Sequence, residues 1–415
     1  MELSTMVRMA WRNLWRNGRR TVLTLFSIAF GLFLAVLMTA MQDRNWADMI
    51  DLAARLGGGH VTVQHEEFRD TPTLDRTVDG VSAIAERALE DPEVTHVSVR
   101  VAGQALLSTA SSSRGAAFVA VDPRAETPST LAVLEAIVEG EMFGSSDDPG
   151  IVLGARLAEN LGVSLGKKVV YNMTDRHGDI IAGLGRVVGI VRTGSPSVDN
   201  GLCLLPLNTM RRALGYGPEE ATRVAVFIDD QRRSDDVAGR LASAVTPPAT
   251  ALPWHVSQPE LAGFIAMKVG GANFMKILVA VLIAAGIFNT LFVSVTERMR
   301  EFGIMLAIGY SPGDIRTLVM LESFWLGLVG LIVGAALTAG PYLYLHAHGL
   351  DMSAIMGEGS VDIAGIGIST VMKVEIFPVN AVIIAVAALA ATVAAGAYPA
   401  WKAGRVAPVE TIRLV

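Results

Sequence analysis

The 415-residue sequence is poor in cysteine and in charge. Its one cysteine, Cys203, excludes an intrachain disulfide and a cysteine-based metal cluster. Charged residues make up only 18% of the chain and the formal net charge is −6, so no overall basic field favours nucleic acid. The chain is instead apolar, since 51% of its residues are hydrophobic and its mean hydropathy of +0.45 is high for a soluble protein.

Motifs for nucleotide and metal binding are also missing. The Gly-Lys pair in GVSLGKK (162–168) lacks the P-loop spacing, and Lys168 stands where a Ser or Thr would hold Mg²⁺. HEEFR (65–69) has Arg69 where a second zinc-ligating histidine would have to be. No Ser/His/Asp or paired-carboxylate arrangement can be argued. We therefore predict a chain that is not a self-sufficient enzyme and binds no metal or cofactor itself.

Four apolar segments are long enough to cross a bilayer, which takes about 20 residues at 1.5 Å rise each. They lie at 21–41, 277–295, 323–345 and 377–401. The first follows a basic stretch, as a signal peptide would. Its apolar run is too long for a typical signal, however, and Met38-Thr39-Ala40 is a poor cleavage site. We predict four transmembrane helices.

Short basic flanks predict the orientation of these helices. Basic residues lie before the first segment, between the second and third, and after the fourth: Arg8, Arg12, Arg16, Arg19, Arg20; Arg298, Arg300, Arg316; Lys402, Arg405, Arg413. The loop between the third and fourth segments has only Lys373. Because short basic loops stay inside, both termini are predicted to be cytoplasmic and the long region after the first helix to lie outside.

The predicted organisation is one helix, a large extracytoplasmic domain, and three further helices. The boundaries are 1–20 (an amphipathic cytoplasmic segment), 21–41 (first transmembrane helix), 42–270 (outer domain), 271–295 (second helix), 296–316 (cytoplasmic loop), 317–345 (third helix), 346–376 (outer loop), 377–401 (fourth helix) and 402–415 (cytoplasmic tail). The first segment suits the plane of the membrane interface, or serves only as a positive-inside anchor.

The outer domain alternates between strand and helix patterns. VTHVSVRV (94–101) has the alternation of a strand, and VSAIAERALED (81–91) has helical spacing. The fold class is therefore α+β, with two subdomains and a seam near residues 125–150. NTMRRALG (208–215) is predicted to be a helix with Asn208 as its cap and Gly215 as its stop. The proline-rich residues 246–260 are predicted to be a stiff connection back to the membrane.

A few polar and small residues interrupt the apolar segments. Asn289 lies in the middle of the second segment, where its amide needs a partner on another helix or subunit. Gly330 and Gly334 form a G-x-x-x-G pair that permits close helix contact. Glu322, at the start of the third segment, suits solvation at the interface, with a proton relay as the less favoured alternative. No continuous polar lane crosses the bilayer, which disfavours a channel for small solutes.

TERMREFGIMLAIGYSP (296–312), between the second and third segments, has an amphipathic helical pattern. Met299, Phe302 and Leu306 share one face, and Gly309 is predicted to end the helix. Such a helix either lies on lipid or inserts into a groove of a soluble partner. The pattern alone leaves both open, although the mixed charge of the first turn argues against anionic lipid as the main target.

Four stretches of the chain resemble a known family, the MacB/LolC/LolE/FtsX-like ABC transporter permeases. The family's coupling segment is similar to SVTERMREFGIMLAIG (294–309). Its N-terminal helix, periplasmic core domain and C-terminal end are similar to AWRNLWRNGRRTVLT (10–24), DDPGIVLGARLAENLGVSLGKKVV (147–170) and AYPAWKAGRVAPVETIR (397–413). One departure is Lys167-Lys168, where the family more often has an acidic residue after the glycine.

The resemblance implies a permease subunit of the bacterial inner membrane, of the LolC/LolE type without a fused ATPase domain. ATP and Mg²⁺ would be bound by a separate ATPase dimer. Lipoprotein release is the favoured function, with MacB-like tripartite export and FtsX-like regulation of cell-wall hydrolases as alternatives. The implied partners are the ATPase dimer, a second permease subunit (identical or not), membrane lipid, and a periplasmic adaptor or lipoprotein carrier.

Residue by residue, the resemblance assigns ATPase docking to one set, with Phe302 as its anchor because that ring is the largest apolar group on the face. The set is Glu297, Arg298, Arg300, Glu301, Phe302, Gly303, Leu306 and Gly309. Asn289, Gly330 and Gly334 are assigned to a helix or subunit interface.

Overall fold

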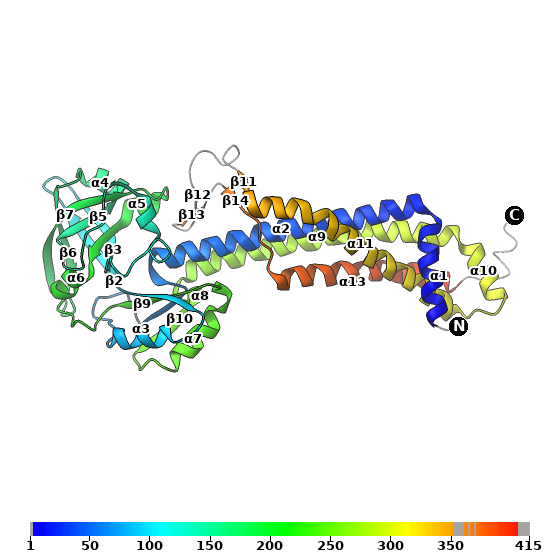
Figure 1. The fold of residues 1–415 in the computed structure, drawn as a ribbon, viewed down its shortest axis with the longest axis horizontal. Coiled ribbons are helices and arrows are strands. Elements are labelled where there is room, and N and C mark those ends of the chain that lie inside the picture. The colour runs from blue at the N-terminus through cyan, green and yellow to red at the C-terminus, as the bar shows by residue number, and fades with distance from the viewer. Residues whose placement is uncertain (1–2, 352–360, 364–365, 369–370, 406–415) are drawn as a thin grey trace. The chain divides into compact units, whose positions relative to one another are not determined.

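The computed structural model describes residues 3–351, 361–363, 366–368 and 371–405. They divide into two compact units (Figure 1). The helical unit consists of Met1–Asn45, Met267–Leu350 and Met372–Val415, and the second unit consists of Trp46–Ala266 and Asp351–Val371. Parts of the predicted outer loop 346–376 and tail 402–415, including Arg413, lie outside the described residues.

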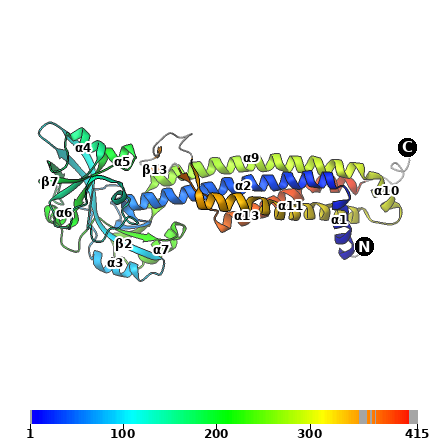
Figure 2. The same cartoon turned by 45° about the horizontal axis from the view of Figure 1, so that its top comes forward.

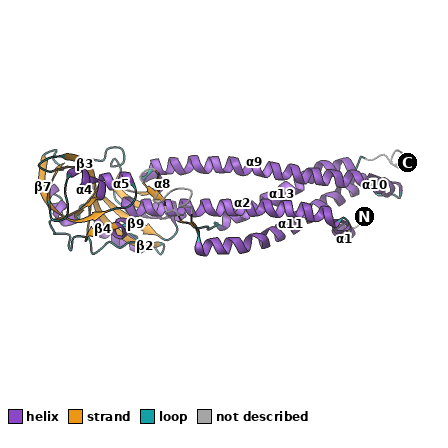
Figure 3. Ribbon diagram, turned by 90° about the horizontal axis from the view of Figure 1, so that it is seen from above, coloured by secondary structure: helices purple, strands orange, loops and turns teal. Residues whose placement is uncertain are grey.

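The helical unit is a bundle crossed at one end by a short helix. Its elements are α1 (Leu3–Arg16), α2 (Gly18–Ala53), α9 (Pro259–Glu297), α10 (Met299–Ala307), α11 (Pro312–His348) and α13 (Pro378–Ala403). In the described chain, α2, α9, α11 and α13 are the helices long and apolar enough to cross a membrane. Figure 3 shows these four running side by side, and α1 packs across α11.

Two of the long helices continue well beyond the predicted apolar segments. α2 has 36 residues and α9 has 39, so they are about 54 and 58 Å long at 1.5 Å per residue. A bilayer core is only about 30 Å thick. Because α2 ends at Ala53 and α9 begins at Pro259, the stretch between these two helices, residues 54–258, is shorter than the predicted 42–270 domain.

Two glycines on α11 allow close contact with α2. A Cβ on Gly330 would lie 2.6 Å from a methyl carbon of Ile28, and one on Gly334 would lie 2.6 Å from a methyl carbon of Leu32. Both clashes are with α2 of the same chain. A larger residue at either position would therefore push α2 away from α11.

The second unit is built on a ten-stranded mixed sheet. Its strands are β1 (Val61–His65), β2 (Val94–Ser108), β3 (Ser113–Val121), β4 (Ile137–Gly140), β5 (Gly150–Gly154), β6 (Lys168–Thr174), β7 (Ile180–Val191), β8 (Leu202–Pro206), β9 (Arg223–Ile228) and β10 (Ala249–Pro253). The order is β10-β1-β9-β2-β3-β8-β5-β7-β4, and β6 pairs with both β2 and β7. The strands from β2 round to β7 and β6 thus form a closed ring.

Short helices cover this sheet. They are η1 (Ala54–Gly58, a π-helix), α3 (Val81–Leu89), η2 (Ala132–Ala136), α4 (Ala155–Leu161), α5 (Pro196–Gly201), α6 (Leu207–Leu214), η3 (Gln231–Arg233), α7 (Ser234–Ala242) and α8 (Trp254–Ser257). α3 and α7 pack on the β1–β9–β10 part, and α4, α5 and α6 lie around the ring (Figure 2). Four short strands lie outside the large sheet: β11 (Leu350–Asp351), β12 (Val361–Ile363), β13 (Ile366–Ile368) and β14 (Val371–Met372).

The predicted seam near residues 125–150 is wrong. Both β4 and β5 pair with β7 inside the ring, so the sheet is continuous through that region. The change of partner falls inside β2, whose residues 94–100 pair with β9 while residues 101–108 pair with β3. The long strand β2 therefore belongs both to the β1–β9–β10 part of the sheet and to the ring.

Two local predictions also need correction. Asn208 does not cap α6, because the helix begins at Leu207 and the Asn208 amide donates to Ser146 at 3.0 Å. Residues 246–260 contain β10 and α8 rather than only a connection. The stop at Gly215 is confirmed, since its φ of +72° lies in the left-handed region that glycine adopts at helix ends.

Candidate functional site

The segment 296–312 forms α10 and the turn into α11. Gly309, with φ of +105°, ends the helical stretch. Ser311 then caps α11, because its hydroxyl accepts from the N–H of Asp314 and the Asp314 carboxylate accepts from the N–H of Ser311, each at 3.0 Å. Pro312 fills the first position of that helix, where a missing N–H costs nothing. Local sequence alone thus accounts for this turn.

One face of α10 is packed against its own bundle. Phe302 is fully buried, with Val295, Ile315, Val319, Ala400 and Ala403 in the same cluster. Gly303 is buried as well, and Leu306 is partly buried against this cluster. Phe302 therefore cannot be a surface anchor in this structure, and its choice for that role is corrected. The ring holds α10 to α9, α11 and α13.

The opposite face of α10 is open. Arg300, Ile304 and Ile308 follow one another at a spacing of four residues and share this face, as expected from the helical period. Ile304 is 48% exposed and Ile308 is 71% exposed. Because the other face is packed against the bundle, this exposed face is the one available to a partner.

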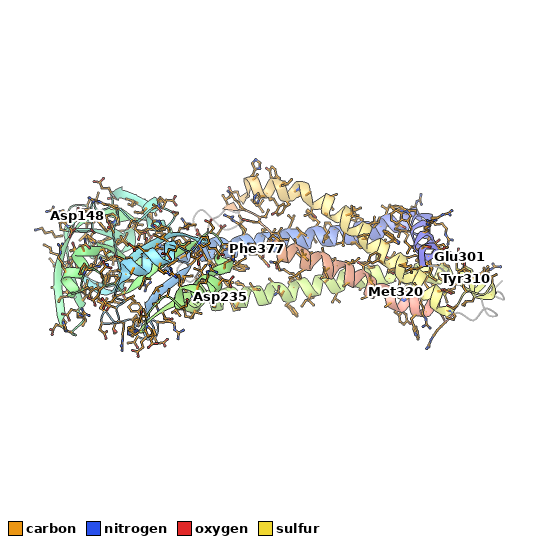
Figure 4. All side chains as sticks on the ribbon, turned by 60° about the horizontal axis from the view of Figure 1, so that its bottom comes forward. Asp148, Asp235, Glu301, Tyr310, Met320 and Phe377 are labelled. Atoms are coloured by element: carbon orange, nitrogen blue, oxygen red, sulfur yellow. The ribbon has the colours of Figure 1, made fainter. Side chains whose placement is uncertain are left out.

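Ion pairs tie α10 to α1 and α11. Glu301 accepts from Arg16 at 2.5 Å and from Arg298 at 3.2 Å. Arg298 also donates to both carboxylate oxygens of Glu322, at 2.8 and 3.0 Å, and Asn13 donates to the same carboxylate at 2.7 Å. We call Asn13, Arg16, Arg298, Glu301 and Glu322 the polar cluster. Figure 4 labels Glu301 beside Tyr310 at this end of the unit.

The ion pairs of the polar cluster differ in how much they contribute to stability. Burial raises the pKa of Glu301, but hydrogen bonds from Arg16 and Arg298 outweigh it and hold the pKa below its usual range. The Arg16–Glu301 pair is half exposed, and such pairs contribute about 0–1 kcal/mol. Arg298 and Glu322 are only 12% and 13% exposed, so loss of either leaves the other partly desolvated. Glu322 is thus paired within the protein rather than merely solvated.

A cavity of about 310 Å³ lies among these side chains, lined by residues of α1, α2, α9, α10 and α11. Arg20 and Glu297, which form a further ion pair, also line it. Water takes about 30 Å³ per molecule, so the cavity has room for several waters. Water in this cavity could solvate the charged side chains while their ion pairs break and re-form with other partners.

Asn289 lies on a different and largely uncovered helix. Only 6% of the apolar window of α9 is buried, compared with 39% for those of α2 and α11. The Asn289 side chain is exposed on α9 and forms no hydrogen bond with the described residues. Gly330 and Gly334, in contrast, face α2 of the same chain. The structure therefore does not bring these three predicted interface residues together.

The part played by α1 was not predicted. Met6, Ala10 and Leu14 form its buried face, and Trp11 meets Trp325 of α11 with ring centroids 5.1 Å apart. The spacing of these apolar residues identifies the packed face. It does not identify the partners of Asn13 and Arg16, which are 309 and 285 residues away in sequence.

Two family models match this chain. The MacB-like periplasmic core domain matches residues 21–244, and the FtsX-like permease C-terminal model matches residues 273–408. The chain belongs to the MacB/LolC/FtsX-like family of ABC transporter permeases. The second match includes α10, Arg298, Glu301 and Glu322, whereas α1 precedes both matches.

Several relatives of this permease are known by name. The lipoprotein-releasing system transmembrane protein LolC of Xylella fastidiosa (strain Temecula1) is 26% identical over 347 residues, which are 79% of each chain. The macrolide export ATP-binding/permease protein MacB of Hyphomonas neptunium is 23% identical over 99% of this chain and 61% of its own. The ABC transporter permease YtrF of Bacillus subtilis is 33% identical over 36% of this chain and 33% of its own.

Solved structures of extracytoplasmic regions also match the permease. The periplasmic region of MacB from Actinobacillus actinomycetemcomitans has a TM-score of 0.35 at 14% identity, covering 50% of this chain and 94% of that one. The extracellular domain of the transporter YknZ from Gram-positive bacteria has a TM-score of 0.33 at 13% identity, covering 46% and 98%.

Proposed function

We propose that this chain is the transmembrane subunit of an ABC transporter that carries motion from a separate cytoplasmic ATPase to the extracytoplasmic side of the bacterial inner membrane. The observation that carries the proposal is α10, which lies between two helices long and apolar enough to cross a membrane and has one face packed and the other open. Both termini and α10 are cytoplasmic in this proposal, in agreement with the basic flanks.

The ATPase is proposed to dock on the open face of α10. Ile304 and Ile308 supply apolar area, and Arg300 supplies one positive charge beside them. A helix that presents such residues at a spacing of four fits a groove with an apolar floor and an acidic edge. Glu297, Glu301 and Gly309 border this face, while Phe302 and Gly303 act from behind it.

Motion of α10 would pass into the bundle by two routes. The first is packing, because Phe302 is buried among residues of α9, α11 and α13 and cannot move without them. The second is the polar cluster, which joins α10 to α1 and α11. α9 then continues unbroken for 39 residues from Glu297 back to Pro259, at the edge of the second unit in sequence.

Lipoprotein release from the membrane is the proposed work. It is supported by the LolC relatives, which match this chain over 79% of both lengths. A MacB-like export function is the second candidate, favoured by a match that spans 99% of this chain. The ATPase is proposed to be a separate chain.

The docking proposal is tested by replacing Ile308 with aspartate. We expect Ile308→Asp to abolish co-purification of the ATPase, because a charge in an apolar groove is left unpaired. The matched control is Ile180→Asp in the second unit, where the isoleucine is also largely exposed. The control should retain the ATPase, and both variants should insert and melt like the wild type. A normal ATPase complex in Ile308→Asp would refute the assignment.

A second permease subunit is proposed to cover the open face of α9. Asn289 would find its hydrogen-bond partner there, a contact worth about 0.6–2 kcal/mol in a membrane. Asn289→Leu should therefore weaken the dimer in detergent roughly 3- to 30-fold, measured by analytical ultracentrifugation. Val386→Leu, at an exposed position of α13, is the control. An unchanged dimer would make Asn289 a lipid-facing amide.

A further inference from the structure

Strands β2 and β9 place two arginines directly opposite each other. Arg100 and Arg223 are register partners in this antiparallel pair. Like charges in that position destabilise a sheet unless something neutralises them. Arg100 is neutralised, because its guanidinium donates twice to Glu126, at 2.8 Å each, and also to the carbonyl oxygens of Gly57 and Thr130.

Arg223 has no comparable partner. The described residues offer its guanidinium neither a carboxylate nor a hydrogen-bond acceptor, and its Nε is buried without a partner. Its close neighbour is the Phe68 ring, 5.5 Å from the guanidinium carbon. Burial and the charge of Arg100 lower the pKa of Arg223 to about 10, so it stays cationic at neutral pH. Arg223 is partly buried, and a partly desolvated cation without a counter-charge is costly, so such groups concentrate at functional sites.

Arg223 lines a cavity of about 240 Å³, whose other polar walls are Thr62, Gln64, Ser257 and Gln258. Gln64 is only 4% exposed, and its side-chain amide makes no hydrogen bond with the described residues. Gln258 uses one N–H on the carbonyl oxygen of Ala53, at 3.5 Å, and has another available. The cavity thus contains a cation and free N–H donors but no carboxylate.

The backbone beside the cavity approaches strand β9 closely. The π-helix η1 leads into Gly57-Gly58-Gly59, and a Cβ on Gly59 would lie 2.6 Å from the backbone nitrogen of Val226. A Cβ on Gly57 would lie 3.6 Å from Nη1 of Arg223. Gly59, at a φ of +75°, is the residue that requires glycine for this approach to β9, and π-helical turns are frequent at functional sites.

We propose that this cavity binds a phosphate-type oxyanion through Arg223 and Gln64. A guanidinium fork matches the oxygens of phosphate, and additional amide donors around it suit a tetrahedral phosphate better than a planar carboxylate. Two sources share this chemistry, namely free phosphate and the phosphate of a lipid headgroup. A ligand held there would bridge β1 and β9 to the end of α2 and the start of α9, which supply Ala53 and Gln258. The inference does not depend on the ATPase.

The test uses the full-length protein in a non-ionic detergent and inorganic phosphate as the first probe. Binding is measured by calorimetry and by the melting temperature at constant ionic strength, with chloride as the balancing anion. The wild type should bind phosphate and melt higher with it. Arg223→Gln should lose at least tenfold in affinity while melting no lower than the wild type without phosphate, because it removes an unpaired charge. Arg114→Gln, which removes an exposed arginine of the same unit, should bind normally.

Further measurements test whether Gln64 donates to the phosphate and whether the natural ligand is free phosphate or a lipid headgroup. Gln64→Leu keeps the cation and should weaken phosphate binding several-fold. Dihexanoyl phosphatidylglycerol binding at least tenfold more tightly than phosphate would indicate a lipid headgroup, and the reverse order would indicate free phosphate. Equal phosphate responses in the wild type and Arg223→Gln would overturn the proposal. So would protection by acetate but not phosphate, or a loss of dimerisation in Arg223→Gln without any phosphate binding.

Discussion

Among the residues that the structure describes, each unit has an arginine–glutamate pair with little exposure, and the two pairs are built differently. In the second unit, Arg100 and Glu126 are 0% and 1% exposed, and their remaining hydrogen-bonding atoms are held by Thr130 and by backbone carbonyls. In the helical unit, Arg298 and Glu322 retain some exposure beside a cavity. Arg298 there divides its donors between Glu322 and Glu301.

The Arg100–Glu126 pair is therefore fixed, whereas the Arg298–Glu322 pair can rearrange. A sealed pair has no alternative partner, so separation of Arg100 from Glu126 would expose both to the full cost of desolvation. Arg298 has two acceptors and nearby space for water, so it can change partners at smaller cost. In the proposed function, the second unit therefore moves as a rigid body while the α1–α10–α11 end changes shape.

The largest effect is expected from Glu126→Gln. The substitution leaves Arg100 without a counter-charge opposite Arg223, and removal of one member of a sealed pair costs about 3–5 kcal/mol. Thermal unfolding of the full chain should show this loss. The double variant Arg100→Met, Glu126→Leu should recover most of the stability, because no charge is then stranded. If Glu126→Gln lowers the free energy of unfolding by less than about 0.5 kcal/mol, the Arg100–Glu126 pair is not the more rigid of the two ion pairs.

Glu322→Gln is expected to reduce the free energy of unfolding less than Glu126→Gln does, but to reduce ATP-driven transport. A partly solvated pair should cost only about 1–3 kcal/mol when it is broken. The ATPase should still bind, because the open face of α10 is unchanged, but ATP-driven transport should fall. Arg12→Gln, at an exposed position of α1 outside the polar cluster, is the control and should leave transport unchanged and stability within about 0.5 kcal/mol. Normal transport in Glu322→Gln would argue against transmission through the polar cluster.

The smallest effect is a pH dependence in the second unit. Burial lowers the pKa of His60, Asp51 partly opposes this, and Arg55 adds to it. The folded state then binds fewer protons than the unfolded state, so the free energy of unfolding should fall as pH drops from 7.5 through the ordinary histidine range. The slope from one proton is at most about 1.4 kcal/mol per pH unit.

His60→Asn should flatten this slope, measured as melting temperature between pH 7.5 and 5.5. His177→Asn, at an exposed position, should leave it as in the wild type. Identical slopes in the wild type and His60→Asn would show that another group is responsible.

Features set by local chemistry were the ones predictable from sequence. The four long helices follow from apolar length, and the stops at Gly215 and Gly309 follow from the left-handed backbone that glycine permits. β10 was missed because its proline-rich surroundings suggest a connection, yet β1 pairs with it along five residues. Proline is compatible with that strand because it lies at the edge of the sheet.

Long-range partners could not be predicted in the same way. Helical periodicity shows that Phe302 and Leu306 share a face, but not whether that face meets a partner or the chain's own bundle. Arg16 and Glu301 are brought together only by the packing of α1 across the bundle. For the same reason, nothing in the local sequence of β9 distinguishes Arg223 from an ordinary surface arginine.

The most direct test of the account is site-specific photocrosslinking on α10. A benzoylphenylalanine at position 308 or 304 should crosslink the permease to its ATPase in native membranes. The same group at the buried position 302 should form only crosslinks within the permease. Crosslinks to the ATPase from position 302, with none from position 308, would contradict the proposal that the open face of α10 receives the ATPase.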